Sequence, residues 1–538
     1  MQTLASVKVQ SWLSWFLRGI LILGSLVLVG RSFELQIIKG SYYREMANEN
    51  RIRRITLTAP RGRILARGGE VLVGNIETKK RVIFDPNSGF HLSDDLSAAK
   101  EDEIASVFKR NYILGSEFAH VSGYVSEATV DQIGKIDPNC PEKGPMISGG
   151  LVGVGGLEQE YNCVLTGTPG EELVEVDTRG VKKRVLAIKP PVSGTDLKTT
   201  IDIGLQKEVS RDMGSARGAA VVTDTKGEVL AFYSSPSFDP DKVAASLDKP
   251  DLPIFDRVID GLFHPGSVFK PIVSVGALSE GVIDKNYLFT DPGVMVVKTL
   301  YGDFSYSNWF FSEYGRTEGA IGLTRAIARS TDTFFYTIGE MLGPDKIAEY
   351  ARKFGLDRPT GIDLPGEAPG LVPTPDWKLK VTGTKWFLGN TYNYSIGQGD
   401  IAVTPIALNQ AIGAIATDEL CKPYISEKIG SSCMDLNIKK DNLDLVHEGM
   451  KEACESGGTA FTFFDFAAKH NGTEVACKTG TAEVGTDGKP HAWFTLFAPI
   501  ENPQIIATVV FEKGGQGSEV AGPVARKIMD YYFSRVNP

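Results

Sequence analysis

The stretch HPGSVFKP, residues 264–271, is the part of this chain around which the rest is organised. It places Ser267 three residues before Lys270, directly after a Pro-Gly pair that favours a turn. Residues three apart lie on one face of a helix, so both side chains are expected on the first turn of a helix. A lysine shielded from water loses part of its charge and can then take a neighbouring hydroxyl's proton. The spacing therefore predicts a nucleophilic serine with its base, although an ordinary helix N-terminus with a solvated lysine has the same pattern.

Two polar clusters further along the chain favour the nucleophile. STD, residues 330–332, falls in an apolar helical run at 323–339, and KTGT, residues 478–481, falls on a predicted strand. Taken alone, a Ser/Thr/Asp cluster in a helix can simply bond backbone carbonyls. Together and in this order, Ser-x-x-Lys, Ser-x-Asp and Lys-Thr-Gly form the three-motif set of penicillin-interacting serine enzymes, apart from Asp332 where that set has Asn.

The chain around these motifs combines longer helices with β-rich runs. A hairpin of two apolar strands is predicted at 218–233, and a closing helix at 524–533. Three more strands are predicted at 474–480, 491–499 and 504–512. Strands at both ends with helices between them predict one α+β domain, residues 196–538, whose sheet pairs its first and last strands.

Residues 33–195 are predicted to form an elongated, β-rich stem. A mixed helical pattern at 33–50 leads into an alternating strand at 51–59, and another strand-like run lies at 172–177. Charged, helical segments at 85–150 are expected to form a small inserted head. The stem and its head together precede the α+β domain.

Residues 12–32 contain the segment that is apolar enough to cross a membrane. The uninterrupted apolar run after Arg18 is shorter than the ~20 residues of a span, so the span is expected to include the aromatic residues before it. No small-residue cleavage site follows, and this favours an uncleaved anchor after a short cytoplasmic tail, residues 1–11. The flanking positive charges are balanced and leave the orientation open. The rest of the chain is expected on one side of the membrane.

Length and composition limit the number of domains and argue against some binding partners. With 538 residues, the chain exceeds what one hydrophobic core supports, which predicts two to four domains. Its net charge of −9, without a long basic run, argues against a nucleic-acid partner. The sequence contains no signature of a cofactor site, so no cofactor is predicted.

Six cysteines stand at positions 140, 163, 421, 433, 454 and 477. Their spacing is not that of a zinc site, so no metal is predicted. An even number in an exported chain permits disulfides, and Cys421 with Cys433 closes a short loop whose oxidation the sequence leaves open. Cys477, next to Lys478, is interpreted as a small apolar residue under its strand and not as a reactive thiol.

Several segments besides the three motifs resemble the class B penicillin-binding proteins. They are APRGRI at 59–64, TFFY at 333–336, GQG at 397–399, GGTA at 457–460 and HAWF at 491–494. The resemblance extends over essentially the whole chain. Asp332 and HVSGYV at 120–125 are most similar to penicillin-binding protein 2 of the rod elongation system. The resemblance implies a β-lactamase-like serine transpeptidase domain with an antiparallel sheet flanked by helices, carried by the stem and the anchor.

The resemblance also implies a reaction, D,D-transpeptidation of peptidoglycan. A stem peptide ending in D-Ala-D-Ala would acylate Ser267 while Lys270 removes the serine's proton, and a neighbouring strand's amine would then accept the acyl group. Ser330 would relay a proton to the departing D-alanine. The implied catalytic residues are Ser267, Lys270, Ser330 and Lys478; the implied substrate-binding and oxyanion residues are Asp332, Thr479, Gly480 and Thr481.

The sequence departs from the family pattern at three places. Asp332 adds a negative charge near two lysines and is expected to keep at least one protonated, without indicating which. Some rod-type relatives hold zinc near this site through Asp, His and Cys, whereas residues 272–419 here contain no His and no Cys, so no zinc is predicted. The stem turn LARGG, residues 65–69, lacks the usual Asp-Arg-Asn-Gly, and this puts partner contacts of the stem in doubt.

The partners that the resemblance implies are nascent peptidoglycan stem peptides, β-lactam antibiotics, a SEDS-family (RodA-like) glycosyltransferase and rod-complex proteins such as MreC. It implies a single-pass protein of the cytoplasmic (inner) membrane with its catalytic domain on the periplasmic side. The sequence leaves open a division-type class B transpeptidase, a membrane-anchored β-lactamase or D,D-carboxypeptidase, and a non-catalytic β-lactam sensor. A β-lactamase would need a group that activates water, and a sensor would need several spans and an effector.

Overall fold

The computed structural model describes residues 5–85, 89–97, 104–147, 149–177, 181–299, 302–485 and 488–536. It divides into two compact units that interleave along the chain. The first contains residues 1–60, 76–109 and 167–193, and the second contains 61–75, 110–166 and 194–538. The expected division into tail, anchor, stem with head, and C-terminal domain remains a prediction.

The first unit begins with a long apolar helix. Helix α1 (Ala5–Phe33) continues into a π-turn (Glu34–Ile38), and residues Trp12–Ile38 are long and apolar enough to cross a membrane. Helix α2 (Gly40–Arg51) and strand β1 (Ile52–Leu57) follow, which confirms the helix-to-strand change predicted near residue 51.

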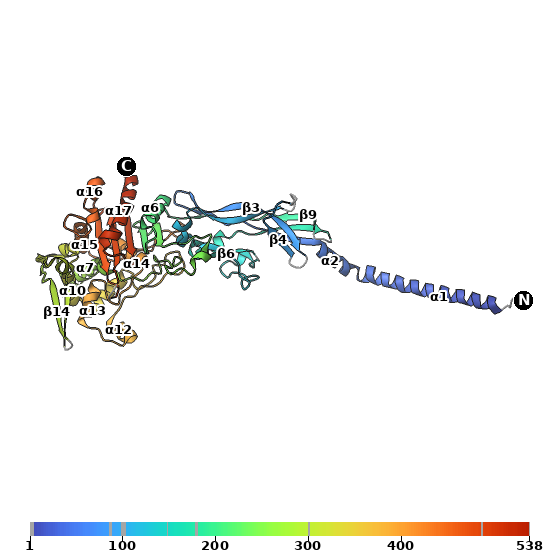
Figure 1. Ribbon diagram of the computed structural model, residues 1–538, viewed down its shortest axis with the longest axis horizontal. Helices are drawn as coiled ribbons and strands as arrows, with labels where there is room; N and C mark the ends of the chain where they lie inside the picture. Colours follow the sequence, from blue (N-terminus) through green and yellow to red (C-terminus); the bar gives the residue numbers. More distant parts are fainter. Residues whose placement is uncertain are drawn as a thin grey trace. The chain divides into compact units, whose positions relative to one another are not determined.

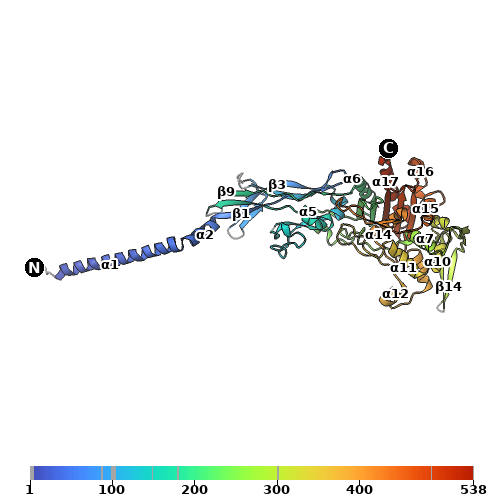
Figure 2. The ribbon, with the colours of Figure 1, turned by 180° about the vertical axis from the view of Figure 1, so that it is seen from behind.

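The same unit contains a three-stranded antiparallel sheet in the order β1-β8-β9. Its two edge strands, β1 and β9, are labelled in Figure 2. Strand β8 (Gly170–Val176) lies in the middle, and β9 (Lys182–Lys189) forms one edge. The buried side chains are few: Ile55, Val174 and Val176 form a small core. Ion pairs link β8 to β9 across the sheet, for example Lys182 with Glu172 at 2.7 Å.

The segment expected as a helical head contains mainly strands in its described part. It includes β4 (Gly89–Ser93), β5 (Ile104–Tyr112) and β6 (Tyr124–Glu127), with one four-residue α-helix, α3 (Ala119–Ser122). The prediction of helical segments was therefore wrong. Strand β5 pairs with β3 (Val71–Asp85), so a long-range partner, invisible to local helix propensity, determines its conformation.

A buried charge network lies in the second unit, where β2 (Ile64–Leu65) pairs with β3 and with β10 (Leu197–Lys198). Glu158 lies within α4 (Gly156–Glu160), which follows β7 (Leu151–Val154), and is fully buried. Its carboxylate accepts hydrogen bonds from Arg61 at 3.0 Å and from Arg110 at 2.6 Å. These pairs join residues 48 and 97 positions apart.

The second unit is built on a five-stranded antiparallel sheet in the order β12-β11-β21-β20-β19. Its strands are β11 (Gly218–Thr223), β12 (Val229–Ser235), β19 (Ala476–Ala482), β20 (His491–Ala498) and β21 (Ile505–Phe511). Strand β11 pairs with β21, Gly218 facing Phe511. The predicted pairing of the first and last strands is confirmed.

Helices cover both faces of this sheet (Figure 1). On one face, α6 (Ile203–Met213) and α17 (Gly517–Val536) pack against apolar side chains of every strand. On the other face, α7 (Lys270–Ser279) and α14 (Pro405–Thr417) complete the larger core. Burial on both faces explains the near-continuous apolar runs of the strands.

Local sequence explains where several of these helices start. Asp202 caps α6 by accepting the backbone N–H groups of Gly204 and Leu205. Helix α17 begins seven residues before the predicted start at residue 524 and contains Pro523, a residue that disfavours the interior of a helix. The chain before Pro523 is drawn into the helix by packing, since Ala521 is buried in the core beneath the sheet.

Further helices of the second unit lie between β12 and β19 in the sequence. They are α8 (Trp309–Tyr314), α9 (Leu323–Arg329), α10 (Asp332–Leu342), α11 (Pro344–Lys353), α12 (Pro375–Thr382), α13 (Leu388–Ser395), α15 (Lys440–Cys454) and α16 (Phe466–Lys469). Short paired strands accompany them, among them β14 (Val294–Thr299) with β15 (Gly302–Ser307) and β17 (Glu419–Cys421) with β18 (Cys433–Asp435).

All six cysteines form disulfides, which are Cys140–Cys163, Cys421–Cys433 and Cys454–Cys477. The pairing of Cys421 with Cys433, which the sequence left open, is present. The interpretation of Cys477 as an apolar filler was wrong, because Cys477 is bonded to the end of α15. The partner is 23 residues away, and no local pattern marks it.

Candidate active site

Ser267 lies in a tight turn that abuts the edge of the main sheet. Residues Gly266–Phe269 form a 3₁₀ turn, and α7 begins only at Lys270 with Pro271 in its first turn. The prediction that both residues share the first turn of one α-helix needs this correction. Gly266 has a φ of 58°, and a Cβ there would lie 3.1 Å from the carbonyl oxygen of Thr481 on β19. The nucleophile turn therefore packs directly on the KTGT strand.

Ser330 breaks the helical run that the sequence predicted as continuous. It lies between α9 and α10 with φ 56° and ψ 39°, a left-handed conformation that costs a non-glycine residue roughly 1–3 kcal/mol. Two donors hold the carbonyl groups of this break. The indole N–H of Trp309 donates to Arg329 O at 2.8 Å, and Lys270 Nζ donates to Ser330 O at 2.8 Å.

The hydroxyl of Ser330 lies between the two lysines of the motifs. Lys270 Nζ is 3.1 Å and Lys478 Nζ is 3.0 Å from Ser330 Oγ. Both lysines are fully buried, and Lys478 also donates to Thr479 O at 2.9 Å. A hydroxyl can donate one proton and accept others, so Ser330 can pass a proton from one amine to the other.

Asp332 pairs with Lys270 and not with Lys478. Its Oδ1 is 2.6 Å from Lys270 Nζ, while its Oδ2 accepts the backbone N–H of Trp309 at 3.2 Å. Burial lowers the pKa of Lys270, and the attraction of Asp332 opposes this shift. Burial and the charge of Lys270 lower the pKa of Lys478 well below its usual value. Lys478 is thus the amine that is more readily neutral.

The expected contact between Lys270 and the nucleophile is not formed in this structure. Among the described residues, the ammonium group of Lys270 hydrogen-bonds to Ser330 and Asp332 and not to Ser267. It also lies 5.1 Å from the centre of the Phe335 ring. A carboxylate gives a charge-assisted bond about twice as strong as a bond to a neutral hydroxyl, so Asp332 holds the amine.

The residues of the KTGT strand differ in how far they are exposed to solvent. Thr481 is exposed, whereas Thr479 is buried and its hydroxyl lies 2.9 Å from that of Thr459. A Cβ on Gly480 would come 2.9 Å from Trp493 Cβ and 3.0 Å from Val268 Cγ1. Only glycine therefore lets β19 approach the nucleophile turn this closely.

Several supporting residues were not found by the sequence analysis. Asn308 and Trp309 bind the backbone and side chain of Asp332, and Thr459 binds Thr479. Gln398 Nε2 lies 3.5 Å from Thr481 O. Gln398 and Thr459 fall in segments that carry the family resemblance, which could have indicated them; Asn308 and Trp309 follow no motif.

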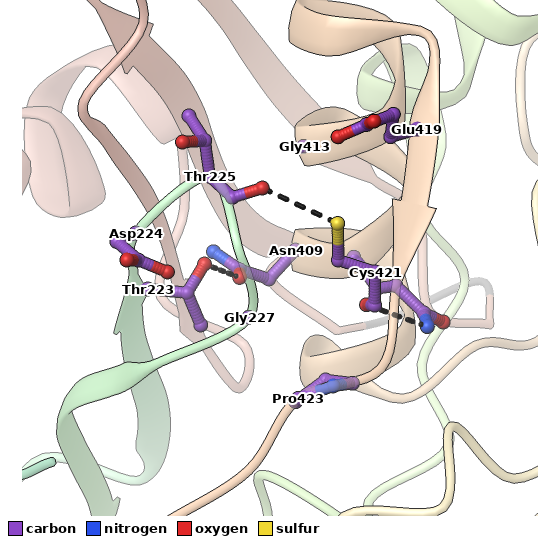
Figure 3. Close-up of a pocket in the computed structure, with 10 residues that line it drawn as sticks. Thr223, Asp224, Thr225, Gly227, Asn409, Gly413, Glu419, Cys421 and Pro423 are labelled. Carbon is purple, nitrogen blue, oxygen red and sulfur yellow. Dashed lines mark hydrogen bonds between the residues drawn. The ribbon is translucent and has the colours of Figure 1, made fainter. Parts of the chain in front are cut away.

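A pocket outside the three motifs lies between the β11–β12 turn and α14 (Figure 3). Thr223 donates to Asn409 Oδ1 at 2.7 Å, and Gln410 donates to Cys421 O at 3.0 Å. Burial raises the pKa of Asp224, which also lines this pocket. The first bond ties the main sheet to α14, the second ties α14 to β17, and the pocket brings together none of the motif residues.

The candidate metal ligands of the described chain fit no zinc site at the motifs. Two groups combine cysteines with a carboxylate, Asp137 with Cys140 and Cys163, and Glu419 with Cys421 and Cys433. In each group the two cysteines form a disulfide and offer no thiolate. At the motifs, both oxygens of Asp332 are already held by protein donors. The absence of zinc there stays a prediction.

Several known proteins similar to this chain come from one family. A family model, the penicillin-binding protein transpeptidase domain, matches residues 218–530, and a second, the penicillin-binding protein dimerisation domain, matches residues 90–199. The chain is 30% identical to peptidoglycan D,D-transpeptidase MrdA of Escherichia coli K12, over 95% of this chain and 92% of that protein. It is 29% identical to the protein of the same name from Haemophilus influenzae, over 97% of this chain and 91% of the relative.

A solved structure shares the architecture. The penicillin-binding protein PBP2 of Helicobacter pylori, determined in a complex with MreC, superposes with a TM-score of 0.76. Its sequence is 26% identical, and the match covers 90% of this chain and 99% of that one. The match includes the mixed α+β fold with its antiparallel sheet.

Proposed function

This chain belongs to the penicillin-binding protein transpeptidases, and from that membership we propose that it is a peptidoglycan D,D-transpeptidase acting through an acyl-enzyme on Ser267. The observation that carries the proposal is the Ser330 hydroxyl held between two buried lysines, beside a nucleophile turn that packs on the KTGT strand. Acyl transfer needs a nucleophile, a base and a proton path, and this arrangement supplies all three.

The proposed first step is a proton relay through Ser330. Lys270 passes a proton to the Ser330 oxygen while the Ser330 hydroxyl passes its own to Lys478. Lys270 becomes neutral and Lys478 becomes an ammonium, so total charge is unchanged. Neutral Lys270 then takes the proton of Ser267 as the serine oxygen attacks the carbonyl of the penultimate D-alanine.

The proposed substrate contacts come from the KTGT strand. The exposed hydroxyl of Thr481 and the charge of Lys478 bind the terminal carboxylate of the stem peptide, and Thr479, whose hydroxyl bonds Thr459, holds the strand in place for this contact. The backbone N–H groups of Ser267 and Thr481 form the oxyanion hole, where each donor contributes ~3 kcal/mol. Gly480 allows the strand to approach closely enough for both tasks.

The second half of the reaction reverses the proton path. The tetrahedral intermediate collapses, the peptide bond breaks, and the leaving D-alanine takes its proton from Lys270 through Ser330. The amine of a neighbouring peptide then attacks the acyl-enzyme and gives a proton to neutral Lys270. As the ester bond breaks, Lys270 passes that proton to the oxygen of Ser267, and the free hydroxyl is restored. Asp332 stabilises whichever state leaves Lys270 protonated.

The proposed biological role is cell-wall elongation, as the names of the relatives and the structural match to PBP2 suggest. We extend the MreC partnership of the Helicobacter pylori protein to this chain, together with a SEDS-family glycosyltransferase bound through the anchor and stem. Co-purification from detergent tests this extension. A chain that copurifies instead with division proteins would assign it to the division type.

The proposed location is the cytoplasmic membrane, with the catalytic domain outside the cytoplasm. Residues Trp12–Ile38 supply one span near the N-terminus. The three disulfides lie beyond it, and disulfides form and persist in oxidising compartments. The proposed layout is a tail at 1–11, an anchor at 12–32, a stem at 33–195 and a transpeptidase domain at 196–538.

Labelling with a fluorescent penicillin tests the proposed chemistry. The wild-type chain is expected to take up one acyl group, located at Ser267 by peptide mass, and Ser267→Ala is expected to take up none. An adduct on another residue contradicts the proposal. Sustained turnover of nitrocefin over many equivalents would instead support a β-lactamase, which shares the acylation step but hydrolyses the adduct.

A further inference from the structure

Helix α15 lies between the elements that carry the second and third motifs. It packs against α9, which ends at Arg329 directly before Ser330, and against β19, which carries Lys478. The approach to α9 is close, because a Cβ on Gly449 of α15 would come 2.8 Å from Ile327 Cβ. Movement of α15 would therefore be transmitted to both motifs.

The end of α15 and the residues after it, 454–459, are fastened to both motifs. Cys454 forms a disulfide with Cys477, and Thr459 hydrogen-bonds Thr479 at 2.9 Å. A third bond joins the carbonyl of Gly457 to the guanidinium of Arg329, the residue before Ser330, at 3.2 Å. These attachments reach the direct sequence neighbours of Lys478 and Ser330.

The alternation of side chains along β19 explains why such attachments matter. Successive residues of a strand point to opposite faces, so Cys477 and Thr479 lie on one face and Lys478 on the other. The segment 454–459 binds β19 at Cys477 and at Thr479, the two residues on either side of Lys478. The strand is thereby fixed against sliding and tilting while Lys478 projects toward Ser330.

We propose that residues 454–459, with the Cys454–Cys477 disulfide as their covalent part, are a positioning element that sets the distance between Lys478 and Ser330. The inference rests on the proposed function and adds to it a group of residues outside the three motifs. The segment acts through Lys478 and Ser330, so its members are positioning residues.

The test compares two disulfide variants of the full-length chain in detergent, using a fluorescent penicillin as the probe. One is Cys454→Ala with Cys477→Ala. The matched control is Cys421→Ala with Cys433→Ala, which removes a disulfide that joins β17 to β18 and touches none of the motifs. For each variant, the non-covalent dissociation constant, the first-order acylation constant and the melting temperature are measured separately.

The first variant is expected to lose on the order of tenfold or more in the acylation constant, because small misplacements of reacting groups cost up to about a hundredfold. Its non-covalent dissociation constant is expected to stay within about twofold of the wild-type value. The acylation constant of the control variant is also expected to stay within about twofold of the wild-type value. Equal acylation constants for the two variants, measured below both melting temperatures, overturn the inference. A wild-type chain that takes up no penicillin overturns the proposed function as well.

A second pair of variants keeps the disulfide and addresses the possibility of misfolding. Thr459→Val removes the hydroxyl bond to Thr479, and Thr459→Ser retains a hydroxyl at the same place. The valine variant is expected to lose several-fold in the acylation constant, because Thr479 then has no hydroxyl partner at residue 459, and the serine variant is expected to recover it. A serine variant as slow as the valine variant overturns the inference.

Discussion

Asp332 determines which of the two buried lysines carries a positive charge at rest. Its carboxylate accepts a hydrogen bond from Lys270 at 2.6 Å and makes no ion pair with Lys478, which has no carboxylate within ion-pair distance in the described chain. Two adjacent ammonium groups in a dry site repel each other, so the lysine without a counter-ion loses its proton first. The single change from the Asn of the wider motif set to Asp thus sets the direction of the proton relay.

Asp332→Asn is expected to move the acid limb of the acylation pH profile to lower pH by about one unit or more. Asp332 raises the pKa of both lysines, so its removal lets them become neutral at lower pH. A charge-assisted bond of ~1.5–3 kcal/mol corresponds to roughly one to two pH units. The second-order rate constant of penicillin acylation, measured from low to high pH, checks this.

The matched control for this change is Asp465→Asn, which removes a carboxylate paired with Arg526 at 2.5 Å, away from the three motifs. Its acid limb is expected to coincide with that of the wild type. A coincident limb for Asp332→Asn would show that Asp332 does not influence the titrating lysine.

Gly480→Ala is expected to slow acylation on the order of a hundredfold with a smaller effect on stability, because the new Cβ pushes β19 away from the nucleophile turn. Gly413→Ala on α14 is the control, since its Cβ would have no neighbour closer than 3.8 Å and alanine favours a helix. Acylation constants and melting temperatures of both variants check this. A Gly480→Ala enzyme with a wild-type acylation constant would contradict the close approach.

At the scale of elements, the break between α9 and α10 is what brings Ser330 to the lysines. A continuous helix would leave the Ser330 carbonyl bonded within the helix and point its side chain along the helix face. The left-handed conformation of Ser330 instead leaves that carbonyl free of the helix, and Lys270 donates a hydrogen bond to it. Helix α8 supports the break from outside, since Trp309 binds both Arg329 and Asp332.

Trp309→Phe is expected to destabilise this break. The variant keeps an aromatic ring but loses the indole bond to Arg329 O, which costs ~1–3 kcal/mol of local stability when a buried carbonyl is left unpaired. We expect a several-fold lower acylation constant at a temperature where the chain is folded. The assay is penicillin acylation alongside thermal unfolding.

Trp386→Phe is the control for this variant, since it also loses one indole bond, to the hydroxyl of Thr391 at 2.8 Å. It is expected to affect the melting temperature more than the acylation constant. If both tryptophan variants slow acylation equally, the specific role of α8 is refuted.

At the scale of the whole molecule, charged residues far apart in the sequence are joined in the interior. Arg61 and Arg110 converge on the fully buried Glu158. The segment APRGRI, residues 59–64, resembles the class B family, but its local sequence gives no physical reason for Arg61. The structure supplies the reason, since a buried carboxylate must be compensated by nearby positive charge.

Glu158→Gln is expected to lower the free energy of unfolding by about 3–5 kcal/mol, because it leaves two buried guanidinium groups without their negative partner. The acylation constant of the folded protein is expected to stay within about twofold, as the network contains none of the motif residues. Chemical unfolding followed by fluorescence measures the first quantity, and penicillin acylation measures the second. An unchanged unfolding free energy would show that the network is not stabilising.

The sequence by itself determined the features that depend on neighbours along the chain. The spacing of Ser267 and Lys270, the strand that carries Lys478, the membrane-spanning length of α1 and the pairing of the terminal strands all follow from local periodicity and element order. The three motifs, with the family resemblance around them, named the catalytic and substrate-binding candidates, but not Asn308 and Trp309, which bind Asp332.

Only the tertiary structure decided how residues distant in sequence pair. It placed Asp332 on Lys270, joined Cys454 to Cys477, broke the helix at Ser330 and turned the expected helical head into strands. Each of these features depends on contacts between segments that are distant in the sequence, and the local propensity of one segment carries no information about such contacts. The physical reason is that the position of a residue along a helix or strand determines which face of that element its side chain occupies. Packing between segments determines which charged groups and which cysteines come into contact.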